Sequence, residues 1–168
     1  MDYGFDSKTR QEIDYYVGYF WQATDDISLD LTYYQYEYPR ESVLNNSETY
    51  TKLTAYGAYI GGYYSDDFDG DQSYLYGFVG YETTLPMEVG LDLRYGQVDF
   101  KDDTFFDRDE SARSRYNEWQ VTLSKTLVGA DWSLAYVDSD LSDTECASYN
   151  GFDDVCSPTV IAGVSKSF

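Results

Sequence analysis

The side chains of this sequence that could do chemistry are mainly carboxylates and phenols. The chain contains 31 Asp and Glu, 20 Tyr, 11 Lys and Arg, two Cys and no His. Without His it can form neither a Ser-His-Asp nor a Cys-His arrangement, nor a zinc site that uses His. A carboxylate pair could perform acid–base chemistry, but among 31 acidic residues some proximity arises by chance. We therefore predict no catalytic residues, no cofactor and no enzyme activity.

The acidic run from Asp66 to Asp71 is the best candidate for a metal site. Its possible ligands are Asp67, Asp69 and Asp71. Alternate acidic residues supply the hard oxygen ligands that calcium prefers. An EF-hand loop, however, needs Gly where Gln72 stands and Glu where Phe78 stands. We therefore favour an acidic hairpin loop that faces water over a specific metal site.

Two cysteines, Cys146 and Cys156, bracket a loop rich in Asp, Ser, Asn and Gly. Such a pair favours a disulfide formed in an oxidising compartment such as the periplasm or the cell surface. Two unpaired thiols are the alternative, which is less favoured because exposed thiols are a liability outside the cytoplasm.

Charge and composition exclude several classes of protein. A formal charge of −20 is unsuited to nucleic acid, because affinity for that backbone comes mainly from Lys and Arg. An aromatic content of 19% argues against disorder. No run of about 18 apolar residues is present, so the sequence predicts no transmembrane helix. We expect one folded domain over residues 1–168.

The dominant pattern has a period of two residues, which is typical of strands with one apolar and one polar face. It is clearest from Met87 to Tyr95, where Val89, Leu91 and Leu93 oppose Gly90, Asp92 and Arg94. The other expected strands cover residues 12–21, 27–34, 50–56, 58–65, 73–85, 118–124, 130–140 and 159–168, with a stub at 2–5. For residues 58–65 and 73–85 the pattern does not show which face is apolar, because Tyr and Gly occupy both. No helix is expected.

The connections alternate in length, which is typical of an up-and-down meander in the outer membrane. Short turns are expected at residues 23–26, near Gly57, and at 84–86 and 128–130. Longer polar loops are expected at residues 39–48, 66–72, 101–115 and 141–158. This alternation predicts short periplasmic turns, long extracellular loops and a periplasmic C-terminus. The 101–115 loop is interpreted as a solvated surface loop, with folding into a barrel mouth as the alternative.

Period two alone does not decide whether the apolar face meets lipid or forms the core of a soluble barrel. Ionisable residues in mid-strand and aromatic residues near the strand ends favour lipid. We therefore predict an all-β, antiparallel, up-and-down transmembrane β-barrel of about ten strands. Its candidate pore-lining residues are Glu12, Asp14, Asp30, Glu82, Glu88, Asp92, Arg94 and Glu118. Their acidic balance would favour cations or small neutral solutes, whereas pairing of Arg94 with Asp92 or Glu88 would plug a narrow lumen.

The final strand resembles the C-terminal signal that the outer-membrane assembly machinery reads in bacterial barrels. The residues that carry this resemblance are Val160, Ala162, Val164 and Phe168. Over essentially the whole chain, residues 27–39 (ISLDLTYYQYEYP), 119–127 (WQVTLSKTL), 134–141 (LAYVDSDL) and the cysteine loop leading into 164–168 (VSKSF) resemble the TorF porin family. No single one of these motifs is highly specific, and their order and spacing carry the resemblance.

The resemblance implies a bacterial outer-membrane barrel with a channel role. It also implies that the chain lacks the family's signal peptide and first strands, so that a full-length member has about twelve. The expected function is passive diffusion of small solutes or ions, and the alternative is a closed barrel that acts through its acidic loops. The expected partners are outer-membrane lipid, lipopolysaccharide bridged by divalent cations, the assembly machinery, and small solutes or ions.

Overall fold

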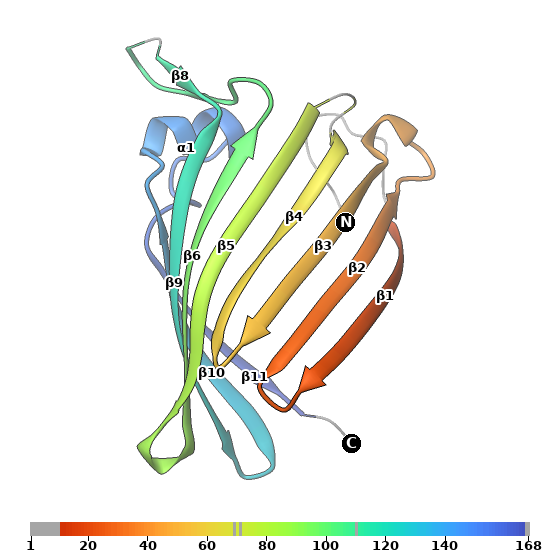
Figure 1. Cartoon of the computed structure of the whole chain (residues 1–168). Coiled ribbons are helices and arrows are strands. Elements are labelled where there is room, and N and C mark those ends of the chain that lie inside the picture. The colour runs from red at the N-terminus through yellow and green to blue at the C-terminus, as the bar shows by residue number, and fades with distance from the viewer. Residues whose placement is uncertain (1–10, 69, 71, 110, 167–168) are drawn as a thin grey trace.

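The computed structural model describes residues 11–68, 70, 72–109 and 111–166. Its main feature is one antiparallel sheet of nine strands, with the order β1-β2-β3-β4-β5-β6-β9-β10-β11 (Figure 1). These strands are β1 (Ile13–Thr24), β2 (Ile27–Glu37), β3 (Asn46–Ala55), β4 (Ala58–Phe68), β5 (Gln72–Leu85), β6 (Val89–Phe100), β9 (Arg115–Leu127), β10 (Ala130–Ser139) and β11 (Thr159–Ser165). Each pairs with its neighbour along the chain, apart from the short ribbon between β6 and β9.

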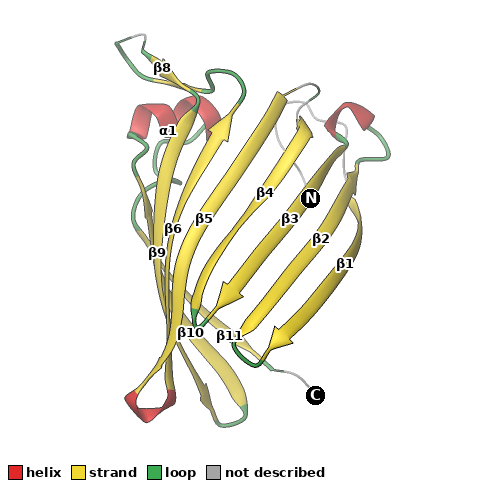
Figure 2. Cartoon of the chain, viewed as in Figure 1, coloured by secondary structure: helices red, strands yellow, loops and turns green. Residues whose placement is uncertain are grey.

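The remaining elements lie at the two ends of the sheet (Figure 2). They are the 3₁₀ turns η1 (Ser42–Leu44) and η2 (Pro86–Glu88), the ribbon β7 (Phe105–Phe106) with β8 (Ala112–Arg113), and helix α1 (Asp143–Asn150). The β7–β8 ribbon and α1 lie together at the end that carries the long connections. None of the helical segments in the described ranges has the length and hydropathy needed to cross a membrane.

The antiparallel all-β prediction is confirmed, with differences at several boundaries. Strand β3 begins at Asn46, four residues before the expected start, so the preceding loop is shorter. The prediction of a strand from Met87 is wrong: Met87 and Glu88 have φ values of 66° and 59° and form the turn η2 before β6. Pro86 favours this turn because it lacks an N–H for a strand ladder. The expected stub at residues 2–5 lies outside the described residues.

The prediction that no helix occurs is also wrong, because α1 forms inside the cysteine loop. The Ser142 side chain accepts from the backbone N–H of Glu145, and the Glu145 carboxylate accepts from the N–H of Ser142. This reciprocal capping box satisfies two N–H groups at the helix start. Gly151 ends the helix with φ 79°, a conformation that glycine adopts without steric cost. The sequence pattern S-x-x-E was therefore the available signal for this helix.

The sheet curls, and β10 and β11 pass behind the middle strands in Figure 1. It is not closed, because β1 and β11 are both edge strands among the described residues. Successive neighbours are antiparallel, so in a sheet of nine strands β1 and β11 run in the same direction. The shown architecture is thus a curved antiparallel sheet with two free edges.

The two faces of the sheet differ in burial as their alternation predicts. Among the described residues, the buried hydrophobic side chains within the nine-stranded sheet are Tyr59, Phe78, Val98 and Phe100, and all four lie on one face. We call this the concave face. The opposite, outward face exposes aliphatic side chains such as Leu93 (41%), Val121 (40%) and Leu123 (40%). The structure also assigns the two ambiguous strands: Tyr59, Tyr63, Tyr74 and Tyr76 are concave, and Ile60, Tyr64, Leu75 and Val79 are outward.

Candidate functional site

The concave face carries most of the ionisable residues that the sequence singled out. The pairing register places one continuous row across six strands: Asp30, Lys52, Gly61, Phe78, Gly96 and Glu118. Tyr59 and Tyr76 extend across glycines of the adjacent strand, Gly80 and Gly96 respectively, and contact a residue one strand further on. Hydrogen bonds between tyrosines and carboxylates on this face therefore connect strands that are not adjacent in the sheet.

Arg94 and Glu118 form the central ion pair of this face. Arg94 Nη2 lies 3.7 Å from Glu118 Oε1 and donates to Gln120 Oε1 at 2.8 Å. The Tyr76 hydroxyl also donates to Glu118, crossing over Gly96 on β6. Arg94 was expected to pair with Asp92 or Glu88. That expectation is wrong, because cross-strand neighbours meet on one face of a sheet and β9 supplies the acid.

Asp92 is bound to a tyrosine two strands away. The Tyr59 hydroxyl donates to Asp92 Oδ1 at 2.6 Å, joining β4 to β6 across β5. The Tyr59 ring lies directly over Gly80, and a Cβ at Gly80 would collide with its Cζ and Oη atoms. A short residue on β5 is thus required for this hydrogen bond.

A second ion pair joins Lys52 on β3 to Glu82 on β5. Lys52 Nζ lies 2.7 Å from Glu82 Oε1 and 4.1 Å from the centroid of the Tyr59 ring. The lysine therefore combines a charge contact with a cation–π contact. Among the described residues, the two basic groups of the concave sheet face, Lys52 and Arg94, are both paired with acids.

Glu48 is a member of this face that sequence reasoning missed. It accepts hydrogen bonds from the hydroxyls of Tyr36 (3.2 Å) and Tyr74, so three strands converge on one carboxylate. The sequence interpretation placed Glu48 at the end of a polar loop. Its even spacing from Tyr50 and Lys52 was the signal that could have placed it on the strand.

The other predicted lining residues are more peripheral. Asp30 faces the concave side and accepts from Thr32 Oγ1 at 3.2 Å. Asp14 has the same orientation but lies on the exposed edge strand β1. Glu12 precedes β1, and Glu88 lies in the turn η2, so neither belongs to the wall of the sheet.

The remaining predicted sites are partly described. Val160, Ala162 and Val164 share the outward face, opposite Tyr136, Leu134 and Trp132, while Phe168 lies outside the described residues. Asp67 accepts from the Ser47 backbone N–H at 2.8 Å and from the hydroxyls of Ser47 and Ser65. Asp69 and Asp71 are not described. Within the described ranges, no three acidic or Cys side chains form a group that could hold a metal.

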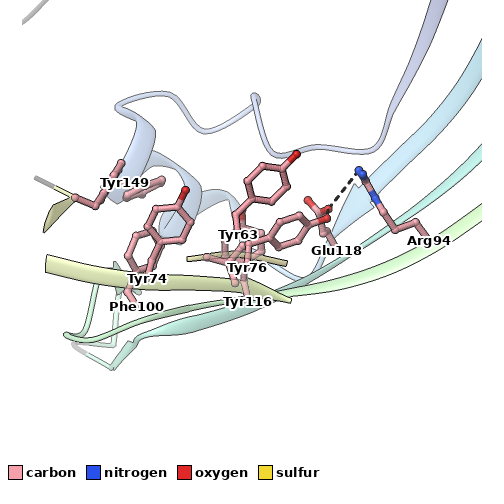
Figure 3. Close-up of a pocket in the computed structure, with 10 residues that line it drawn as sticks. Tyr63, Tyr74, Tyr76, Arg94, Phe100, Tyr116, Glu118 and Tyr149 are labelled. Carbon is pink, nitrogen blue, oxygen red and sulfur yellow. Dashed lines mark hydrogen bonds and ion pairs between the residues drawn. The ribbon is translucent and has the colours of Figure 1, made fainter. Parts of the chain in front are cut away.

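A cavity of about 410 Å³ opens at the end of the concave face nearest α1 (Figure 3). Its lining residues are Tyr63, Phe68, Tyr74, Tyr76, Arg94, Val98, Phe100, Tyr116, Glu118 and Tyr149. Figure 3 shows the aromatic rings at one end and the Arg94–Glu118 pair at the other. Tyr149 comes from α1, and its ring lies 5.7 Å from Phe100 and 5.2 Å from Phe105, centroid to centroid.

Helix α1 is held over this cavity by charge pairs and a disulfide. Arg113 on β8 contacts both oxygens of Glu145, through Nε at 2.5 Å and Nη2 at 2.8 Å, and it pairs with Asp140 at 3.3 Å. Hydrogen bonding from Arg113 lowers the pKa of the Glu145 carboxyl below its usual value. The predicted disulfide between Cys146 and Cys156 is confirmed, with a Cα–Cα distance of 5.9 Å. Residues 101–115 were interpreted as a solvated surface loop, but Phe105 is fully buried, and the β7–β8 ribbon forms a cap together with α1.

Comparisons with known proteins identify a family without naming an activity. No curated protein matches the chain. No solved structure matches it either. A family model described as "Bacterial protein of unknown function (Gcw_chp)" matches residues 2–168, so the chain belongs to this bacterial family.

Proposed function

We propose that this sheet is the wall of a transmembrane β-barrel in the bacterial outer membrane, through which small solutes diffuse passively. One observation carries the proposal: the outward face presents an exposed apolar band, while the concave face holds the mid-strand charges. A soluble monomer would cover so large an apolar face, because extensive exposed apolar patches mark contact with a membrane or with another protein.

The outward face carries charges only near the ends of its strands, among the described residues. These charged positions are Glu37, Asp99, Arg115, Lys125 and Asp138. Between them lie side chains such as Leu31, Ile60, Val79, Leu93 and Val121. Trp21, Tyr95, Trp119 and Trp132 are also exposed on this face. An exposed apolar band that also carries aromatic side chains is consistent with the lipid-facing surface of an outer-membrane barrel.

Closure of the barrel requires more than contact between β1 and β11. These edges run in the same direction, whereas outer-membrane barrels of bacteria are antiparallel with an even number of strands. In lipid, unpaired edge N–H and C=O groups would each cost several kcal/mol. We therefore propose that at least one further antiparallel strand lies between the two edges in the complete barrel. The resemblance to the TorF porin family supports the same architecture.

The charge balance of the concave face supports a lumen that favours cations. Lys52 and Arg94 are each paired with an acid, whereas Asp30, Glu48 and Asp92, which lie on the same face, form no ion pair with a basic residue among the described residues. Rings of carboxylates attract cations into a pore. In the proposed orientation α1 and the β7–β8 ribbon are extracellular, and the short turns and the C-terminus are periplasmic.

Conductance in planar bilayers tests this function directly. Protein from the whole reading frame, refolded in detergent, should give discrete conductance steps and a reversal potential that shows selectivity for K⁺ over Cl⁻. Replacing Asp92 and Glu48 together by Asn and Gln should reduce that selectivity severalfold, since the acidic excess of the face falls by two. A matched double variant in the loops, Asp102→Asn with Asp103→Asn, should change selectivity less.

A second candidate function is a closed barrel that acts through its acidic surface loops. The packing of Tyr50, Tyr59, Tyr63, Tyr76 and Phe78 favours it, because these rings contact one another over the middle of the concave face. Bilayers that remain silent despite inserted, folded protein would support this candidate and contradict diffusion. Monodisperse protein in plain buffer would contradict both.

A further inference from the structure

We infer that the cavity beneath α1 is a binding site for a neutral ring sugar of the pyranose type. This inference is independent of the proposed diffusion function, because the site could bind its ligand whether or not the barrel conducts. The inference rests on the shape of the cavity, on its aromatic surfaces and on the particular donors and acceptors in its lining.

The cavity has the size and surface of a small-molecule site. Its volume of about 410 Å³ lies within the ~300–1,000 Å³ range of ligand pockets, which are mostly lined by apolar and aromatic side chains. Tyr74, Phe100 and Tyr149 offer ring faces at one end, and Tyr76 and Tyr63 line its middle (Figure 3). A pyranose ring presents C–H groups on its faces, which pack against aromatic rings.

The polar groups of the cavity suit hydroxyls, which both donate and accept hydrogen bonds. Arg94 lines the cavity, and its guanidinium group carries N–H donors. Glu118 supplies carboxylate acceptors beside it. Tyr63 and Tyr116 also line the cavity, and the hydroxyl of each can donate or accept a hydrogen bond. Adjacent hydroxyls on a sugar ring could therefore satisfy donor and acceptor together.

The charge of the lining favours a neutral ligand over an ion. The charged groups that line the cavity are Arg94 and Glu118, of opposite sign and 3.7 Å apart. An organic cation stacked on the tyrosines would lie beside the Arg94 guanidinium. An anion would instead lie near Glu118, and near Glu48 behind Tyr74. A neutral polyol is repelled by neither Arg94 nor Glu118.

One side of the cavity is formed by elements that lie outside the sheet. Tyr149 belongs to α1, whose segment is closed by the Cys146–Cys156 disulfide and anchored by Arg113 to Glu145. Tyr116 of β9 packs against Phe105 of the ribbon with a centroid distance of 5.2 Å. The aromatic end of the site is thus fixed by contacts outside the sheet.

Calorimetry on refolded protein in a detergent without a sugar headgroup, such as an amine oxide, tests the site. Glucose and maltose are the ring probes, acyclic sorbitol is the matched polyol, and choline is the cationic probe. Saturable binding of glucose or maltose, at least tenfold tighter than sorbitol and choline, is the expected result. Tighter binding of choline, or no difference between maltose and sorbitol, would overturn the inference.

Two variants assign the binding to this cavity. Tyr63→Phe combined with Tyr116→Phe keeps both rings and removes both hydroxyls, and should weaken sugar association about tenfold, as expected for two lost hydrogen bonds. Tyr136→Phe with Tyr95→Phe, on the outward face, is the matched control and should leave it unchanged. Equal affinity in both double variants, each verified as folded by circular dichroism, would exclude the cavity. Because no bilayer is used, absence of conductance does not affect this test.

Discussion

At the scale of single residues, glycines on the concave face make room for tyrosines on neighbouring strands. Tyr59 lies over Gly80, and Tyr76 lies over Gly96, where a Cβ would come within 2.5 Å of the Tyr76 ring. Each tyrosine hydroxyl then donates to a carboxylate on the strand beyond the glycine: Tyr59 to Asp92 and Tyr76 to Glu118. Glycine weakens a strand on its own by roughly 0.5–1 kcal/mol relative to alanine. Its presence here is therefore explained by the side chain that lies across it.

Gly80→Ala should destabilise the folded protein by about 1–3 kcal/mol, the usual cost of overpacking. The added methyl would meet Tyr59 and the Leu93 carbonyl oxygen, 2.5 Å away, and would displace the hydrogen bond to Asp92. Urea-dependent unfolding in lipid vesicles measures the change. Gly77→Ala on the same strand is the control, since a Cβ there has no neighbour within 4 Å, and it should be neutral or slightly stabilising. Equal stabilities of the two variants would contradict this account.

At the scale of elements, α1 and the β7–β8 ribbon form a cap that packs on itself and on the end of the sheet. Phe105 is fully buried between Phe100, Tyr116 and Tyr149, which joins the ribbon, the sheet and the helix. Arg113 and Glu145 add a bidentate ion pair, with the Glu145 side chain 10% exposed. We therefore expect the cap to open as a unit that loses these contacts with Phe100 and Tyr116, while the strands of the sheet remain paired.

The cap should loosen in acid. The folded-state pKa of Glu145 is lowered by its hydrogen bonds from Arg113. The stabilisation of the cap by the ionised Glu145 carboxylate is therefore complete above the unfolded-state pKa, and it is lost as the pH falls through the folded-state pKa. Arg113 stays charged throughout, because its pKa is raised. Hydrogen-exchange protection of the α1 amides, measured from pH 7 down to pH 3, should fall at the acidic end. In the Glu145→Gln variant, the hydrogen-exchange protection of the α1 amides should be lower at pH 7 and should vary less with pH. If the pH profile of this variant matched that of the unaltered protein, Glu145 would not be the group that controls the cap.

Loss of the disulfide should weaken the same cap. Cys146 and Cys156 are separated by ten positions, and closing a loop of this length stabilises by about 3 kcal/mol in the chain-entropy model. Cys146→Ser with Cys156→Ser should therefore increase protease cleavage within residues 143–158, while amide protection in β5 and β6 stays the same. Loss of protection in those central strands would show that the cap and the sheet unfold together.

At the scale of the whole molecule, the sheet has its apolar side chains exposed and its aromatic and charged side chains gathered on the concave side. Val121 and Thr122 are adjacent on β9 and show this division: Val121 pairs with Leu93 and Tyr136 outward, and Thr122 pairs with Asp92 on the concave side. Under the proposed membrane orientation, the same substitution at these two positions should have different consequences.

Val121→Arg should lower the free energy of unfolding in lipid vesicles by about 2–4 kcal/mol, the cost of a basic residue at the bilayer midplane of a barrel. Thr122→Arg places the same side chain near Asp92 on the concave side and should cost much less. Urea titrations of both variants in vesicles provide the comparison. A larger penalty at Thr122 than at Val121 would mean that the outward face does not meet lipid.

The sequence by itself determined most of the strands, because alternation is a local property of extended backbone. It divided residues between the two faces only where apolar and polar residues alternate clearly, and the tertiary structure assigned the faces of β4 and β5. The sequence also indicated the Cys146–Cys156 pair, whose members are close along the chain. Only the tertiary structure decided that Arg94 pairs with Glu118, that Tyr59 crosses Gly80 to reach Asp92, and that Tyr149 lines the cavity. These contacts depend on the register between strands and on the reach of long side chains over neighbouring glycines, which the pattern of a single strand does not contain.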